Sequence, residues 1–351
     1  MVVAHRGASV EQPENTIEAF EAAIDAGADA VEFDVRMTKD GHAVVMHDPD
    51  VSRTTGGSGL ISELSLDEVR RLRIALPGGL ATGVPTLDEA LECLSGRVAA
   101  DIEIKNLPWE PGFTSDREAA VDATLDALDA VGFPGQVIVS SFNPASIAHS
   151  RRLRPDVPTG LLTAYDVDAD VALAQARADG HPWILPYVSK VLEAGDGFSG
   201  RVRAGGALLG VWIADDPDIA RRLFELGADA VATNDPREIV PVRNTVVRSR
   251  GSDGARGNAE GRPPRISVDY LKKDRRDRLK LTTVGAREDA ARLGVQFHDG
   301  MRITAYDIDH DDAGDRDDLI VEATVRFNSE EGCWVAEFDR GAIRHESEER
   351  V

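Results

Sequence analysis

Residues 2–35, VVAHRGASVEQPENTIEAFEAAIDAGADAVEFDV, hold two short apolar runs with an amphipathic segment between them. The runs VVAH (2–5) and AVEFDV (30–35) have the length and the β-branched content of strands. The segment over 15–27 repeats apolar residues at helical spacing and ends at Gly27, as many helices do. A strand, a helix and a second strand in this order predict a parallel pair with a crossover helix.

The same alternation continues along the chain to about residue 240. The further runs of strand character are 98–104, 137–142, 159–164, 183–187, 208–214 and 230–234. Helical patterns between strands include 64–72, 116–132 and 216–227. Eight strands with crossover helices over ~240 residues match a (β/α)₈ or TIM barrel, whose active site lies at the C-terminal ends of the strands. A doubly wound open sheet is the alternative, but no glycine-rich dinucleotide fingerprint follows the first strand.

The composition changes after residue 242. Residues 243–264 contain RSRGSDGARGNAEGRPP without apolar periodicity, which is typical of a flexible linker. Alternating strand-like runs then follow, and one short helical pattern lies over 287–294; the runs are 278–284, 301–309, 319–327 and 333–340. The predicted divisions are a barrel domain over 1–242, a linker over 243–264 and a small β-rich domain over 265–351.

The net charge of −22, from 62 acidic and 40 basic residues, disfavours nucleic acid and anionic membrane surfaces as partners, because both would repel the chain. Acid excess with few lysines is typical of proteins from a high-salt cytoplasm, where ions screen such repulsion. Because no apolar run is long enough to span a membrane and no signal peptide is recognisable, we expect a cytoplasmic protein without stable membrane insertion. Cys93 and Cys333 form neither a disulfide framework nor a zinc site.

Carboxylates lie where two of the predicted strands end. Glu32 and Asp34 are two residues apart in the run 30–35, so their side chains share one face of the strand. Helices cover the outer face of a parallel barrel, so both acids should point into its mouth. Glu103, in the run 98–104, supplies a third carboxylate. Three carboxylates suit one divalent cation, Mg²⁺ or Ca²⁺.

Cationic side chains and histidines accompany these acids. His5 and Arg6 end the first strand, Lys105 follows Glu103, and His47 follows the run AVVM. A metal with an arginine and a lysine suits an anion with several oxygens, most commonly phosphate. Two histidines can accept a proton from an attacking hydroxyl and donate one to a leaving alkoxide. The pattern therefore predicts a metal-dependent phosphodiesterase.

Several of these segments together resemble the glycerophosphodiester phosphodiesterase family, a branch of the phospholipase-C-like phosphodiesterase barrels. The matching segments, in order from residue 3 to about 240, are HRGASVEQPENT, EFDVRMTKDGHAVVMHD, RTTGGSG, EIK, SSFNP, GVWIADD and ATNDP. The roles that the resemblance implies are acid/base catalysis for His5 and His47, metal binding for Glu32, Asp34 and Glu103, and phosphate contacts for Arg6 and Lys105.

The resemblance also implies the reaction, hydrolysis of a small glycerophosphodiester to glycerol phosphate and an alcohol. The attacking group is either the substrate's own glycerol hydroxyl, through a cyclic phosphate, or water. Two other functions stay open: a lysophospholipase D or another phosphodiesterase acting on lipid head groups, and a silent barrel beside a C-terminal binding module. The presence of all five predicted catalytic and metal-binding residues favours an enzyme.

Four further residues are candidates for the substrate wall. Glu14 and Asn15 either cap the helix that follows or tether the loop that carries Arg6. Phe142 and Trp212 either pack in the core or contact the glycerol carbons. The family commonly has Thr-Val-Asn after this tryptophan, whereas this chain has Ile-Ala-Asp, so the substrate wall departs from the family pattern.

The predicted C-terminal domain resembles small β-rich domains of salt-adapted proteins. Its run 307–318 is rich in aspartate, as expected of an acidic solvated loop. The sequence assigns this domain no activity. Formation of a homo-oligomer and contact with another partner both stay open as its role.

Overall fold

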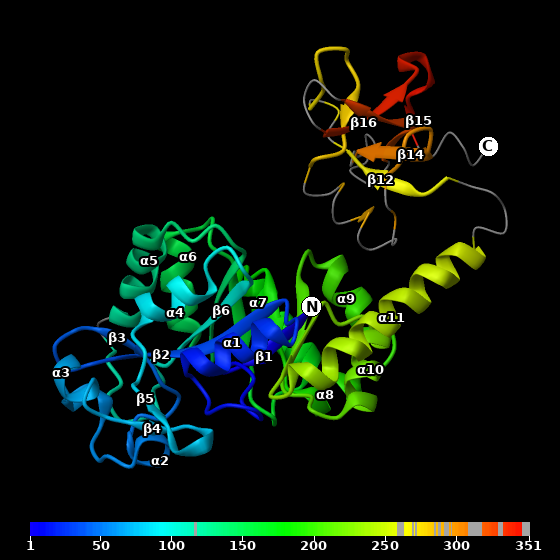
Figure 1. Ribbon diagram of the computed structural model, residues 1–351. Helices are drawn as coiled ribbons and strands as arrows, with labels where there is room; N and C mark the ends of the chain where they lie inside the picture. Colours follow the sequence, from blue (N-terminus) through cyan, green and yellow to red (C-terminus); the bar gives the residue numbers. More distant parts are fainter. Residues whose placement is uncertain are drawn as a thin grey trace. The chain divides into compact units, whose positions relative to one another are not determined.

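The computed structural model describes residues 1–115, 118–257, 263–268, 270, 272–283, 286, 289–290, 295, 297–307, 318–328 and 333–345, with the side chains of 248–257 left aside (Figure 1). By its internal contacts the chain divides into two compact units, Met1–Asn244 and Thr245–Val351. Each unit is described by itself below.

The N-terminal unit is a closed barrel of eight parallel strands, which confirms the predicted (β/α)₈ fold. In chain order they are β1 (Val2–His5), β2 (Ala30–Met37), β6 (Ala99–Ile104), β7 (Val137–Ser141), β8 (Thr159–Leu162), β9 (Trp183–Leu185), β10 (Leu208–Val211) and β11 (Ala230–Thr233). Each strand pairs with the next, and β1 closes the sheet by pairing with both β11 and β2. The first and last strands of the unit are therefore neighbours.

Helices surround this sheet (Figure 1). They are α1 (Ile17–Asp25), α4 (Leu87–Leu94), α5 (Ala119–Val131), α6 (Pro144–Leu153), α7 (Ala169–Asp179), α8 (Val188–Ala194), α9 (Phe198–Ala204), α10 (Pro217–Leu226) and α11 (Pro236–Gly257). Apolar side chains of the strands and helices, such as Phe20, Phe33, Leu91 and Ile102, form the core between the two layers. The outward side chains of β2 are thus buried, and its inward ones face the barrel interior.

The loop after β1 packs closely against α1. A Cβ atom on Gly7, whose φ is +83°, would lie 2.6 Å from the carbonyl carbon of Ala19, so only glycine fits there. Thr16 is the N-cap of α1 and accepts a hydrogen bond from the Ala19 amide. Asn15, proposed from the sequence as the cap, instead has a left-handed backbone (φ 58°) and a different side-chain partner.

A short insert between β2 and α4 forms a rim at one side of the barrel mouth. It contains β3 (Ala43–Val45), which runs antiparallel to β2, then α2 (Ser52–Thr55), η1 (Ile61–Glu63), α3 (Leu66–Val69), β4 (Ile74–Ala75), η2 (Pro77–Gly79) and β5 (Ala81–Thr82). The insert has its own small core, with Met46, Val51 and Ile61 almost fully buried. Of the helix predicted over 64–72, only α3 forms.

Helix α11 continues from the barrel into the segment that we predicted as a linker. The first part of that segment, residues 243–250, contains neither glycine nor proline, so nothing in it stops a helix already under way. The last residues of the predicted linker, 258–262, lie outside the described part of the chain.

The C-terminal unit contains a six-stranded sheet, as expected of a β-rich domain. Its strands are β12 (Arg265–Ser267), β13 (Leu279–Lys280), β14 (Arg302–Asp307), β15 (Leu319–Asn328), β16 (Cys333–Phe338) and β17 (Arg344–His345), with a short η4 (Arg340–Ala342) before the last. Inward side chains including Ile303, Val321 and Val325 form its core. Most of the helix predicted over 287–294, and residues 308–317 of the acidic loop, lie outside the described residues.

Within the described part of the chain, none of the helices combines the length and the apolar character needed to cross a membrane.

Candidate active site

Three buried carboxylates meet at the barrel mouth. Glu32 and Asp34 come from β2 and Glu103 from β6, and the register of the two strands sets Asp34 beside Glu103. One oxygen from each of the three lies within 4.8 Å of those from the other two. The residues predicted as metal ligands are thus brought together.

The three carboxylates lie so close together that their negative charges repel one another. Among the described residues, Glu32 Oε1 is buried without a hydrogen-bond partner. Burial, together with Asp34 and Glu103, raises the pKa of Glu32 well above its usual range. Burial also raises the pKa of Glu103 to about 7, although Lys105 opposes this. An oxygen-ligated divalent cation would offset this repulsion and occupy the free carboxylate oxygen, so the three residues fit such an ion.

Arg6 and Lys105 reach the same acids. Lys105 Nζ lies 2.6 Å from Glu103 Oε1 and 3.2 Å from Asp34 Oδ1, and Arg6 Nε lies 3.4 Å from Asp34 Oδ2. Burial alone would raise the pKa of Asp34, but Lys105, His47 and Arg6 outweigh it and hold that pKa well below its usual range. Asp34, a predicted metal ligand, is therefore held in its ionised form between the two cations that are predicted to contact phosphate.

His5 ends β1 and is almost fully buried. Its Nδ1 lies 2.7 Å from Asn234 Oδ1, and the Asn234 amide nitrogen donates to Asp215 at 2.7 Å, which orients the amide oxygen toward His5. The imidazole therefore carries its proton on Nδ1 and presents Nε2, which lies 4.0 Å from Glu32 Oε2. Burial, assisted by Arg6, lowers the pKa of His5 to about 4.

His47 lies on the rim insert, just after β3, and its side chain is 29% exposed. Its Nδ1 lies 2.7 Å from Asp48 Oδ1, so a carboxylate orients this imidazole where an amide orients His5. Burial lowers the pKa of His47, whereas Asp34 and Asp48 oppose that shift. Both histidines line the same cavity.

Arg36, which was not among the residues predicted from the sequence, holds the segments that carry His47 and Lys105. This buried side chain, two residues beyond Asp34 on β2, donates from Nε to the carbonyl oxygen of His47 at 2.7 Å. It also donates to the carbonyl oxygen of Lys105 at 3.4 Å and to Glu110 Oε2 at 2.6 Å. The sequence did contain a signal for Arg36, because this residue continues the alternation of Glu32 and Asp34 and its side chain therefore shares their face of β2.

Glu14 and Asn15 lie in the loop that carries Arg6. Asn15 Nδ2 donates to Asp34 Oδ2 at 2.8 Å, so it orients a predicted metal ligand and does not cap α1. Glu14 Oε1 accepts from Arg6 at 3.0 Å, as the proposed tether requires. Glu14 also accepts two hydrogen bonds from Arg53, a contact that the sequence did not indicate.

The cavity has a volume of about 790 Å³ and extends from the mouth into the barrel interior. Phe142 and Trp212 form part of its wall with their rings edge to face, 5.2 Å apart between centroids. Trp212 Nε1 donates to the carbonyl oxygen of Leu185 at 3.0 Å. Both aromatic residues therefore pack against the barrel and also line the cavity, and their contact with the glycerol carbons stays a prediction.

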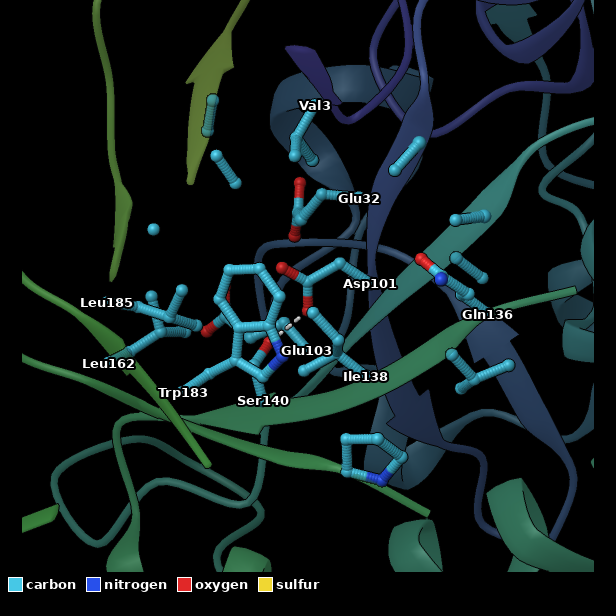
Figure 2. A pocket seen from close by; sticks show the side chains of 18 of the residues that line it. Val3, Glu32, Asp101, Glu103, Gln136, Ile138, Ser140, Leu162, Trp183 and Leu185 are labelled. Carbon is cyan, nitrogen blue, oxygen red and sulfur yellow. Dashed lines mark hydrogen bonds between the residues drawn. The ribbon is translucent and has the colours of Figure 1, made fainter. Parts of the chain in front are cut away.

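Deeper in the cavity lies a fourth acid, Asp101. Figure 2 shows its side chain beside those of Glu32 and Glu103, with Trp183 and Leu185 on the apolar side of the cavity. Ser140 Oγ donates to Asp101 at 2.6 Å, and burial raises the pKa of Asp101 to about 6. It sits outside the group of three carboxylates that can share one ion.

Comparisons with known proteins place this geometry among related chains. The model of the glycerophosphoryl diester phosphodiesterase family matches residues 5–238. A glycerophosphodiester phosphodiesterase of Caldanaerobacter subterraneus subsp. tengcongensis is 32% identical over 247 residues, which are 68% of this chain and 96% of that protein.

Solved structures agree. A glycerophosphodiester phosphodiesterase of Thermotoga maritima is 28% identical with a TM-score of 0.56, over 69% of this chain and 97% of that one. A phosphodiesterase of Oleispira antarctica, solved with the product sn-glycerol-3-phosphate, is 25% identical with a TM-score of 0.59, over 70% of this chain and 96% of that one.

Proposed function

The chain belongs to the glycerophosphoryl diester phosphodiesterase family and is a phosphoric diester hydrolase, and we propose that it releases glycerol phosphate from small glycerophosphodiesters with one divalent cation. The observation that carries the proposal is the cluster of Glu32, Asp34 and Glu103 at a cavity that two of these acids line together with His5 and His47. The product named for the Oleispira antarctica relative supports a glycerol phosphate product here as well.

Glu32, Asp34 and Glu103 would hold the cation, either Mg²⁺ or Ca²⁺, since both prefer oxygen ligands. When bound, the ion polarises a phosphoryl oxygen as a Lewis acid. Arg6 and Lys105 would then contact the remaining phosphate oxygens. A lysine has three donors and an arginine five, so each keeps donors beyond those engaged by Asp34, Glu103 and Glu14.

The partners of the two histidines suggest different roles. The pKa of His5 is lowered to about 4, so at neutral pH its Nε2 is free to accept a proton from the attacking hydroxyl. Burial lowers the pKa of His47 as well, but the Asp48 carboxylate opposes this shift by stabilising the protonated imidazole, and we therefore assign to His47 the donation of a proton to the leaving alkoxide. The attacking hydroxyl belongs either to the glycerol of the substrate or to water.

We also propose that this chemistry belongs to residues 1–242, because the family model ends at residue 238. The division into a linker over 243–264 and a domain over 265–351, the cytoplasmic location, the high-salt host and a homo-oligomeric state stay predictions.

The test is release of glycerol phosphate from glycerophosphodiesters of both enantiomeric series, with charged, neutral and acyl-bearing alcohols. Molar KCl is used, with Mg²⁺, with Ca²⁺ and with EDTA, and wild type is compared with His47→Ala. His149→Ala is a matched control, because His149 forms a similar 2.7 Å pair with Asp122 on the outer helices. Metal-dependent release that only His47→Ala abolishes supports the proposal. Release from acyl-bearing substrates alone would instead favour a lysophospholipase D.

A further inference from the structure

Arg53, at the start of the rim helix α2, joins two loops of the candidate active site. Its guanidinium donates to Glu14 Oε2 at 2.9 Å and to Glu14 Oε1 at 2.7 Å. Its Nε donates to Asp48 Oδ2. Glu14 belongs to the loop after β1 and Asp48 to the insert after β3, so one side chain connects segments that are far apart in sequence.

Each of these carboxylates also holds a residue of the proposed mechanism. Glu14 Oε1 accepts from Arg6 at 3.0 Å, and Asp48 Oδ1 lies 2.7 Å from His47 Nδ1. The contacts therefore form a continuous chain that runs Arg6, Glu14, Arg53, Asp48, His47. One end reaches the proposed phosphate contact, and the other reaches the imidazole that transfers a proton.

The chemistry of the chain favours a fixed geometry. A bidentate arginine–carboxylate pair restricts both distance and orientation, which a lysine at the same place would not do. Burial alone would raise the pKa of Asp48, but the contacts with Arg53 and His47 outweigh it and lower that pKa to about 2. Asp48 thus stays an ionised acceptor for His47.

The position of Arg53 argues against a role in stability. Its side chain is 49% exposed, and ion pairs in such surroundings contribute little to the free energy of unfolding, about 0–1 kcal/mol. Small displacements of catalytic groups, by contrast, have large effects on rate. Loss of Arg53 should therefore change catalysis more than folding.

We propose that Arg53 is a positioning residue that couples the phosphate-binding loop to the proton-transferring loop, acting through Glu14 on Arg6 and through Asp48 on His47. The inference rests on the proposed function for its kinetic consequences. Its structural core, a coupling between the loop of Arg6 and the loop of His47, can be measured without any substrate.

The chain offers a matched control in Arg237. This arginine is 54% exposed and also forms a bidentate pair with a glutamate of the loop after β1, Glu11, at 2.7 and 3.0 Å. The side-chain contacts described for Glu11 are with Arg237 and involve no residue of the proposed mechanism. We expect Arg53→Met to lower kcat about tenfold and to raise KM about threefold, whereas Arg237→Met changes neither. Thermal unfolding of both variants should stay within about 2 °C of wild type.

Variants at Glu14 and Asp48 test separately the contact with Arg6 and the contact with His47. Glu14→Gln should act mainly on KM, through Arg6, and Asp48→Asn mainly on kcat, through His47. Adding Arg53→Met to the double variant Glu14→Gln/Asp48→Asn should have no further effect, because its partners are already changed. Arg53→Lys should recover part of the activity lost in Arg53→Met. Full additivity, or an Arg53→Met variant that behaves like Arg237→Met, would overturn the proposal.

Hydrogen exchange supplies the measurement that needs no substrate. In Arg53→Met, backbone amides in both 5–16 and 44–55 should exchange faster than in wild type and in Arg237→Met. Faster exchange in 44–55 alone would contradict the coupling. If wild type released no glycerol phosphate from any diester, the proposed function would fail, and the exchange result would still decide whether Arg53 couples the loops.

Discussion

The two histidines of the candidate site differ in what holds them. His5 lies at the end of β1 inside the closed sheet, and its partner Asn234 follows β11, the strand that closes the barrel. His47 lies on a rim insert with a small core of its own, and its partner Asp48 belongs to a network of partly exposed charges. One of the two proposed proton-transfer residues is thus held by the closure of the barrel and the other by ion pairs.

We therefore expect substitutions around the two histidines to have different effects on stability. Changes around His5 should alter folding and activity together, because its hydrogen bonds join the first strand to the last. Changes around His47 should alter activity with little loss of stability, because the free energy of exposed ion pairs is small.

The largest effect should come from removing the proposed metal ion. EDTA, or the variant Glu103→Gln, should lower activity about 10³-fold, since the cation stabilises transition-state charge by several kcal/mol. Metal content by atomic emission should fall in parallel, and Mg²⁺ or Ca²⁺ should restore the EDTA-treated protein. Asp101→Asn, in the same cavity but outside the ligand group, serves as control and should keep its metal. Full activity in metal-free protein would contradict the assignment.

Substitutions of the two histidines should have the next largest effect, and they test whether His5 and His47 differ in their contribution to stability. Loss of either general acid or base lowers kcat about 10²–10⁴-fold, and we expect this of both His5→Ala and His47→Ala. Only His5→Ala should also reduce the free energy of unfolding, by about 1–3 kcal/mol, because it truncates an almost fully buried side chain and removes its hydrogen bond to Asn234. Urea unfolding checks this, and equal destabilisation by both substitutions would remove the distinction.

Substitutions of Asp48 and Asn234, the partners of the two histidines, should have effects of intermediate size. Asp48→Asn gives His47 the kind of partner that His5 has, and kcat should fall about 10–100-fold without a change in unfolding free energy above about 0.5 kcal/mol. Asn234→Ala should cost about 1–2 kcal/mol of stability, since His5, Ser9 and Asp215 each lose a hydrogen bond with the Asn234 side chain. The reverse pattern, with Asp48→Asn less stable and Asn234→Ala unchanged, would show that the rim supports the fold.

The smallest effect should be that of salt. Raising KCl from about 0.5 M to about 3 M shortens the screening length and weakens exposed pairs such as Arg53 with Glu14. We expect kcat per folded molecule to fall less than about threefold, and this dependence should be weaker in Arg53→Met. A steeper dependence in Arg53→Met than in wild type would speak against ion pairing at the rim.

Much of the fold was predictable because it depends on local patterns. Seven of the eight barrel strands lie within their predicted runs, and β2 (Ala30–Met37) extends two residues beyond the predicted run 30–35. Short apolar runs between amphipathic helices leave few alternatives to a parallel sheet. The cluster of three carboxylates was predictable for a similar reason. Alternation along β2 and β6 fixes which side chains face inward, and strand register then brings them together.

What the sequence did not reveal depends on contacts between distant or irregular segments. Nothing local links His5 to Asn234, because only closure of the barrel makes them neighbours. Arg53 reaches Glu14 through a loop whose path follows no periodic pattern, so its partner could not be assigned. Asn15 and Thr16 are both common N-caps, and the choice of Thr16 follows from the bond of Asn15 to Asp34.

The pairing of β1 with β11 has a consequence for how the protein is made. At a synthesis rate of about 5–20 residues per second, on the order of tens of seconds separate the appearance of His5 from that of Asn234 on the ribosome. During that time the first strand has only one of its two neighbours, and the imidazole lacks Asn234 as the acceptor for its Nδ1 proton. A chain released before β11 would therefore lack the assembled site, so catalytic activity reports that translation has passed the last strand of the barrel.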